Sequence, residues 1–154
     1  MDGLAANMRL HNKGSMTDCT FCKIVAKEIA AKIVYEDNTI IAFLDRKPVN
    51  LGHALVIPKQ HAADMFALSP GAWSALMHTV HFLAPAIAAV ADADGINIRM
   101  NNKSAAGQDV FHAHIHVVPR FTGSDGLSHW QGTAQSDIES ELTAEKIRAV
   151  LRSE

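Results

Sequence analysis

The chain has 154 residues, of which 48% are hydrophobic and 19% are charged, so it has the size and apolar content of one globular domain with one core. Its net charge of −2 and its lack of any lysine and arginine block argue against a protein that binds nucleic-acid polymers, although a small anionic ligand is compatible with this charge. The first residues lack the basic segment followed by an apolar segment that is typical of a signal peptide, and the longest apolar run, residues 82–91, is too short to span a membrane. We therefore expect a cytoplasmic protein without a membrane anchor.

The first predicted elements are an extension and a short helix. Residues 1–15 show no hydrophobic periodicity and are interpreted as an N-terminal extension, which leaves residues 16–154 as a single domain with a C-terminal tail. Thr17 or Asp18 is expected to cap a short helix that places Cys19 and Cys22 on one side, because residues three apart are neighbours on a helix. Two cysteines cannot form a disulfide framework, so their spacing indicates half of a zinc site or a redox pair.

Three strands are expected next. Residues 32–36 and 39–44 are rich in β-forming side chains, and the Asp37-Asn38 pair between them is typical of a hairpin turn. Residues 53–57 predict a third strand, which Pro58 ends because proline cannot donate a ladder hydrogen bond.

The core helix is predicted over residues 69–91, where apolar side chains recur at intervals of three and four. Ser69 can cap it, Pro70 suits its first turn, and Pro85 could kink it. Three more elements follow: a fourth strand over 96–101, a loop over 102–109 whose small residues allow its amides to approach a phosphate, and an amphipathic helix within 137–152.

The most informative stretch is Phe111 to Val118, in which three of the nine histidines alternate with small or apolar residues. On a strand, His112, His114 and His116 would share one face about 7 Å apart and would point into one place. Imidazole serves as metal ligand, nucleophile or proton carrier near neutral pH, so this face predicts a functional site. The alternative is a half-buried strand that shows polar side chains to water.

These residues resemble the His-x-His-x-His-x-x signature of the histidine triad (HIT) family of nucleotide hydrolases and transferases. Residues 19–24, 42–45, 52–61 and 107–108 also look like bacterial Hint-type members, so the resemblance covers about residues 17–126. It implies an α+β fold with a five-stranded antiparallel sheet, a long core helix and a short N-terminal helix, paired in a homodimer. It also implies cleavage at the α-phosphate of a purine nucleotide, either a phosphoramidate or a dinucleoside polyphosphate.

The resemblance further implies roles for single residues. His114 matches the nucleophile, which would form a nucleotidyl-histidine intermediate, while His116 and the loop amides would hold the phosphoryl oxygens. Asp45 resembles the carboxylate that binds the ribose hydroxyls. Asn101 and Gln108 are expected to contact the phosphate or the leaving group. Four apolar residues would line the pocket for the base, although packing in the core explains their apolar character equally well. They are Phe21, Ile24, Phe43 and Leu55.

One residue departs from the family pattern. Asp109 stands where many Hint-type proteins have serine, and it adds negative charge beside the expected phosphate. An ionised carboxylate there would repel the substrate unless it is protonated or turned aside. It could instead act as an acid toward the leaving group.

A structural zinc ion is expected in addition. Cys19 and Cys22 supply two thiolates, and a tetrahedral site needs two more ligands. The zinc-bearing members of the family suggest His61 and His112. His53 is the alternative to His61, but it more closely resembles a family histidine that lies next to the active site, so it is expected at the substrate site. Free buried thiols and a redox pair are the alternatives.

Two other functions fit the same residues. The three alternating histidines could hold a catalytic metal ion that activates water. Alternatively, the protein could be a nucleotide-binding regulatory module with little turnover. The sequence leaves the leaving group open between an amine, an adenylate and a sulfate.

Overall fold

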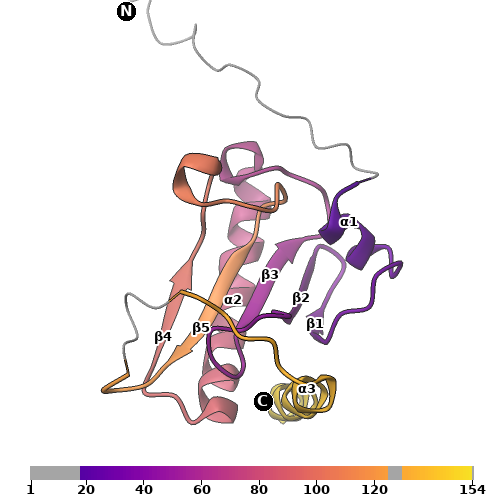
Figure 1. The fold of residues 1–154 in the computed structure, drawn as a ribbon. Coiled ribbons are helices and arrows are strands. Elements are labelled where there is room, and N and C mark those ends of the chain that lie inside the picture. Colours follow the sequence, from indigo (N-terminus) through magenta and orange to yellow (C-terminus); the bar gives the residue numbers. More distant parts are fainter. Residues whose placement is uncertain (1–17, 125–129, 154) are drawn as a thin grey trace, which may run out of the picture.

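A five-stranded antiparallel sheet forms the centre of the computed structural model, which describes residues 18–124 and 130–153. The strand order is β1-β2-β3-β5-β4 (Figure 1). The elements in chain order are α1 (Thr20–Val25), β1 (Ile33–Glu36), β2 (Ile40–Leu44), β3 (Ala54–Pro58), the 3-10 turn η1 (Met65–Ala67), α2 (Pro70–Ala91), β4 (Gly95–Arg99), the 3-10 turn η2 (Ser104–Ala106), β5 (Ile115–Arg120) and α3 (Asp137–Leu151). The α+β architecture is therefore the one expected from the sequence.

Local chemistry explains the elements that were predicted well. In the β1–β2 turn, Oδ1 of Asp37 accepts hydrogen bonds from the backbone of Thr39 and Ile40, both 2.7 Å long. The hydroxyl of Ser69 accepts from the backbone N–H of Ala72 and caps α2 as expected. The helix ends at Asp92, which adopts a left-handed conformation with φ of 52°.

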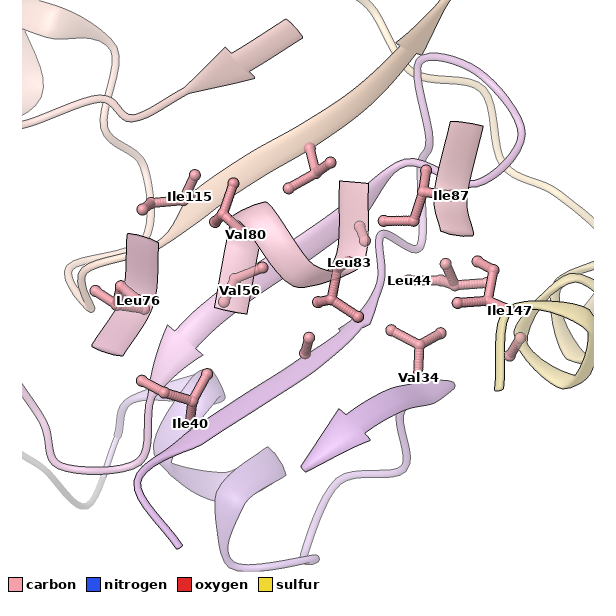
Figure 2. Packing of buried hydrophobic residues seen from close by; sticks show 14 residues of the cluster. Val34, Ile40, Leu44, Val56, Leu76, Val80, Leu83, Ile87, Ile115 and Ile147 are labelled. Carbon is pink, nitrogen blue, oxygen red and sulfur yellow. The ribbon is translucent and has the colours of Figure 1, made fainter. Parts of the chain in front are cut away.

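The main core lies between α2 and one face of the sheet. Leu76, Val80, Leu83 and Ile87 of α2 are at most 1% exposed, and they face apolar side chains of β2, β3 and β5 (Figure 2). Ile147 of α3 completes this core beside β1. Helix α2 is long and apolar enough to cross a membrane by composition alone, but these contacts make it the core helix of the domain.

A second apolar cluster covers the opposite face of the sheet. Helix α1 contributes Phe21 and Ile24, and β2 and β3 contribute the rest: Ile41, Phe43, Leu55 and Ile57. Because β2 and β3 are buried on both faces, they form a rigid support for residues at their ends.

The structure corrects several expectations. Cys19 caps α1 through its thiol, which lies 3.5 Å from the backbone nitrogen of Cys22, so Asp18 is not the cap. The other predicted cap, Thr17, and the predicted extension over 1–15 fall outside the described residues. Pro58 is the last residue of β3, and β4 spans Gly95–Arg99. In α3, which matches the predicted amphipathic helix, two apolar residues are exposed to solvent: Ile138 and Leu142.

The histidine stretch also differs from the expected strand. β5 begins at Ile115, so His116 lies in the strand while His112 and His114 precede it. The ladder with β3 stops at the Val56–Ile115 pair, because Pro58 offers no N–H. Upstream, the backbone N–H of Ala113 donates to the carbonyl of Ala62 instead. The three side chains therefore do not share one strand face.

Candidate active site and zinc centre

Two thiols and two imidazoles converge beside α1. Nδ1 of His112 lies 3.4 Å from Sγ of Cys19 and 3.6 Å from Sγ of Cys22, and Nδ1 of His61 lies 3.3 Å from Sγ of Cys22. In a tetrahedral zinc site with bonds of about 2.0 to 2.3 Å, nitrogen and sulfur ligands are about 3.5 Å apart. The geometry of the four side chains therefore fits a structural zinc ion, and it selects His61 rather than His53.

Protonation in this cluster also suits a metal. Nε2 of His112 lies 2.8 Å from the carbonyl oxygen of Pro58, and because a carbonyl only accepts, Nε2 carries the hydrogen and Nδ1 presents its lone pair to the thiols. Burial lowers the pKa of His112 to about 4, so the ring is neutral at pH 7. Burial and the neighbouring Cys19 raise the pKa of the Cys22 thiol to about 11, so metal binding must release a proton there.

His114 is held in a single orientation next to this cluster. Its Nδ1 lies 2.7 Å from the carbonyl oxygen of His112 and therefore donates to it. The ring is 3% exposed and packs against the edge of Phe21, with centroids 5.3 Å apart. In the neutral imidazole this hydrogen bond places the lone pair on Nε2.

His116 receives its orientation from His53. The backbone N–H of Val49 donates to Nδ1 of His53 over 3.1 Å, so the hydrogen of this imidazole is on Nε2. That Nε2 lies 2.9 Å from Nδ1 of His116 and donates to it, which leaves Nε2–H of His116 as a hydrogen-bond donor. Burial lowers the pKa of His53 to about 4 although the charge of Asp45 opposes this shift. Burial, together with the neighbouring His114 and Arg99, lowers the pKa of His116 to about 3, so both rings are neutral at pH 7.

Asp45 completes this second group at the end of β2. Its Oδ1 accepts from the backbone N–H of Lys47, and its Oδ2 lies 3.7 Å from Nε2 of His53. A cleft of about 570 Å³ opens here, lined by four of the predicted site residues: Asp45, His53, Asp109 and His116. Asp109 is exposed at its rim and accepts from its neighbouring N–H at Val110.

Two predicted phosphate contacts shape the loop before β5. Gln108 is 4% exposed, and its Nε2 donates to the carbonyls of Ala63 and Val110 at 2.6 and 3.0 Å. Both amide hydrogens are therefore engaged within the protein. Nδ2 of Asn101 donates to the carbonyl of Gly107, which adopts φ of +83° and so needs to be glycine. The predicted role of Asn101 at the phosphate stays a prediction.

The four apolar residues predicted to wall the base pack together beside His114. Phe21, Ile24, Phe43 and Leu55 are between 3% and 7% exposed in the cluster beneath α1, and they are not part of the cleft lining described above. Their observed role in the chain is core packing, and the contact with a base stays a prediction.

The structure gives no support to a trihistidine metal site. Among the described residues, the groups with metal-ligand spacing are the cluster of Cys19, Cys22, His61 and His112 and the group of Asp45, His53 and His116. In the second group the proton of His53 is on Nε2, the atom that faces its neighbours, so this imidazole is a donor there rather than a ligand.

Several residues of the cleft were not anticipated. Trp130 packs edge-on against His53 and His116, with centroids 6.0 and 5.4 Å apart, and Arg46 and Lys47 line the same cleft. Trp130 reaches this place because the segment after it crosses the loop that follows β2: Thr133 N–H donates to the carbonyl of Pro48. Trp130 lies in a polar segment without hydrophobic periodicity, so only its large and partly polar side chain could have marked it as a candidate site residue.

Comparison with known proteins agrees with this geometry. The HIT domain model matches residues 26–123. The curated Protein hit of Bacillus subtilis is 39% identical over 124 residues, which cover 80% of this chain and 86% of that protein. The protein named Adenylylsulfatase HINT3 of Arabidopsis thaliana is 35% identical over 118 residues, covering 77% of this chain and 60% of that protein.

Solved structures are similar over most of the chain. A Zn-bound histidine triad family protein from Mycobacterium smegmatis superposes with a TM-score of 0.81 and 34% identity, over 90% of this chain and 96% of that chain. A hypothetical histidine triad nucleotide-binding protein from Sulfolobus tokodaii gives a TM-score of 0.80 and 33% identity, over 88% and 93%.

Proposed function

Because this chain belongs to the HIT domain family, a family of nucleotide-binding proteins and hydrolases, we propose that it is a purine nucleotide hydrolase or nucleotidyl transferase. It cleaves its substrate at the α-phosphate through a covalent intermediate on His114. The observation that carries this proposal is the 2.7 Å hydrogen bond from Nδ1 of His114 to the carbonyl of His112. This bond leaves the Nε2 lone pair free, which is the form in which an imidazole attacks phosphorus.

The reaction consists of two displacements at the α-phosphorus. In the first, Nε2 of His114 forms a bond to phosphorus, and the bond from phosphorus to the leaving group breaks with its electron pair going to the leaving group; an amine also takes up a proton from the solvent as it leaves. In the second, water attacks phosphorus and releases a proton to the solvent, the phosphorus–nitrogen bond breaks, and its electron pair returns to Nε2. The products are a nucleoside monophosphate and the free leaving group; an acceptor other than water makes the enzyme a transferase.

The neighbouring groups stabilise the charge that develops on the phosphoryl oxygens. His116 offers its Nε2–H because His53 occupies Nδ1. The backbone amides of loop 102–109, which Gln108 and Asn101 hold in shape, are the other donors proposed here. Asp45, whose Oδ2 lies 3.7 Å from Nε2 of His53, would accept from the ribose hydroxyls. The name of the Arabidopsis relative as an adenylylsulfatase and that of the Sulfolobus structure as nucleotide-binding support a nucleotide substrate.

Zinc is proposed to have a structural role. Cys19, Cys22, His61 and His112 would hold it, and all four positions of a tetrahedral site would then be filled by protein. A filled coordination sphere leaves no position for a substrate or a water molecule, so the ion would tie α1 to the segments after β3 and before β5. The Zn-bound structure from Mycobacterium smegmatis supports this assignment.

A homodimer is proposed through β4 and α2. β4 is an edge strand of the sheet, and Ile98 on it is 50% exposed. Beside it, an apolar groove of about 370 Å³ runs between α2 and β4, lined among others by Met77, Ala84 and Ile96. A second copy is the occupant that suits both features, since an isologous contact pairs the same strand edge and covers the same groove on each protomer.

The decisive experiment is the variant His114→Asn. It should retain zinc and bind adenosine monophosphate nearly as the wild type does, but lose turnover of an adenosine phosphoramidate by several orders of magnitude, because no other residue can form the intermediate. Rapid quench followed by mass spectrometry should find a nucleotidyl adduct on the His114 peptide of the wild type only. Nucleotide binding without an adduct or turnover in the wild type would instead identify a regulatory binding module.

A further inference from the structure

Arg99 is placed next to the catalytic histidines by the sheet. It is the residue of β4 that pairs with His116 of β5 across the antiparallel ladder, so the two side chains are neighbours on one face. His116 is the group proposed to hold the phosphoryl oxygens. A side chain at position 99 is therefore within reach of atoms bound to that phosphorus.

The guanidinium of Arg99 is held in a defined orientation. Its Cζ lies 4.3 Å from the centroid of the Trp130 ring, a cation–π stack, and its Nε donates to Oδ1 of Asn101 over 2.9 Å. Trp130 in turn packs against His116. One nitrogen of the guanidinium is thus used for positioning, while its planar fork keeps further N–H groups for an anion.

The charge of Arg99 is not neutralised within the described part of the chain. Over residues 18–124 and 130–153 no carboxylate lies within ion-pair distance of it. Arg46 and Lys47 line the cleft next to Asp45, whose carboxylate lies within 4.8 Å of a ring nitrogen of His116. Arg99 therefore supplies, beside His116 and Trp130, a cation that pairs with no carboxylate of the described residues.

We propose that Arg99, oriented by Trp130, is a specificity-determining residue that binds an anionic leaving group, namely a phosphate chain or a sulfate joined to the α-phosphate. This inference rests on the proposed function and narrows its substrate class. An amine leaving group is joined to phosphorus through a neutral nitrogen, so it gains nothing from this guanidinium.

The chemistry of bond breaking agrees with this choice. When the bond from the α-phosphorus to the bridging oxygen breaks, the electron pair leaves on a phosphate or a sulfate, which is stable as an anion at pH 7 and needs no proton. An amine leaving group must gain a proton as its bond to phosphorus breaks. A guanidinium beside the leaving oxygen stabilises an anion and cannot supply a proton, because arginine stays charged in proteins.

The test compares three substrates with the full-length protein. Adenosine 5′-phosphosulfate and diadenosine tetraphosphate carry the two anionic leaving groups, and a lysine adenosine phosphoramidate carries the amine. Arg99→Gln should lower kcat/KM for at least one anionic substrate about 10- to 100-fold, the effect of losing a charge-assisted hydrogen bond, and leave the phosphoramidate within about twofold. Which anionic substrate is affected identifies the source of the anion. Arg99→Lys should recover part of the loss.

Controls separate the possible failures. Arg152→Gln removes an exposed arginine after α3 and should change none of the three rates. Trp130→Ala should lower kcat/KM on all three substrates, because its ring also packs against His116, but more on the anionic substrates, because it also removes the support of the guanidinium. Equal losses on all three substrates in Arg99→Gln, or no loss, would overturn the role of Arg99 while leaving the proposed function standing. A wild-type protein that turns over none of the substrates would overturn the proposed function itself.

Discussion

Replacing Cys22 by serine should release the zinc and lower thermal stability without displacing the catalytic histidines. The proposed ligands Cys19 and His112 are 93 residues apart in the chain. An unfolded chain that used the same ligands would first have to close this loop, at a cost of (3/2)RT ln n, about 4 kcal/mol for n near 93. Zinc therefore binds the folded chain more tightly than the unfolded chain by about 4 kcal/mol, and saturating zinc stabilises the fold by that amount.

For a chain of this size, 1 kcal/mol corresponds to a change in Tm of about 2 to 4 °C, so Tm should fall by about 8 to 16 °C. Calorimetry gives the Tm, and elemental analysis gives the zinc content of wild type and Cys22→Ser. The exposed His78 of α2 supplies a control, since His78→Gln should change neither. Zinc retained by Cys22→Ser would refute the assignment of the ligands, and a wild-type Tm that survives loss of zinc to a chelator would refute the reasoning on stability.

Three further predictions concern assembly, pH and the loop before β5. Ile98→Lys should convert the dimer to a monomer in light scattering at micromolar concentration, whereas the control Ile138→Lys on exposed α3 should not; a monomeric wild type would refute the dimer. The pKa values of His53 and His116 are about 4 and about 3 in the folded chain against 6.5 when unfolded, so the unfolded chain binds protons first as the pH falls. The free energy of unfolding measured in urea should therefore decrease as the pH drops from about 6.5 toward 4, and it should decrease less steeply in His53→Gln. Equal slopes in the two proteins would contradict this. Gln108→Ala should lower that free energy by about 1 to 3 kcal/mol, because it leaves the N–H of Lys103 and two carbonyls without their partner, and an unchanged urea midpoint would show that water replaces the amide.

Much of the fold was predictable because its signals are local. Ser69 and the apolar repeat after it define α2, and the turn at Asp37 defines the β1–β2 hairpin. The grouping of Cys19, Cys22, His61 and His112 required the family resemblance, since no spacing rule joins residues so far apart. The cap at Cys19 was missed because thiols are not among the usual capping groups.

The rest depended on long-range contacts that leave no periodic trace. Trp130 reaches the histidines because the following segment passes so close to the loop after β2 that a Cβ at Gly132 would collide with the carbonyl oxygen of Lys47. Arg99 faces His116 because of the register between β4 and β5, and a sequence does not reveal register between strands joined by a loop. The role proposed for Arg99 could therefore be inferred only from the structure.

The proposed zinc centre and the proposed nucleophile, His114, are linked through His112. Its ring presents Nδ1 to the thiols and donates through Nε2 to Pro58, which fixes the orientation of the residue. Its carbonyl oxygen accepts a hydrogen bond from Nδ1 of His114, which fixes the tautomer of this ring with the lone pair on Nε2. Substitution of His112 removes both the metal ligand and the ring that holds this carbonyl in place. Cys22→Ser removes only a ligand, because the bond to Pro58 remains. Activity measured well below the Tm should therefore fall much further in His112→Ala than in Cys22→Ser, and equal losses in the two variants would show that the metal alone orients His114.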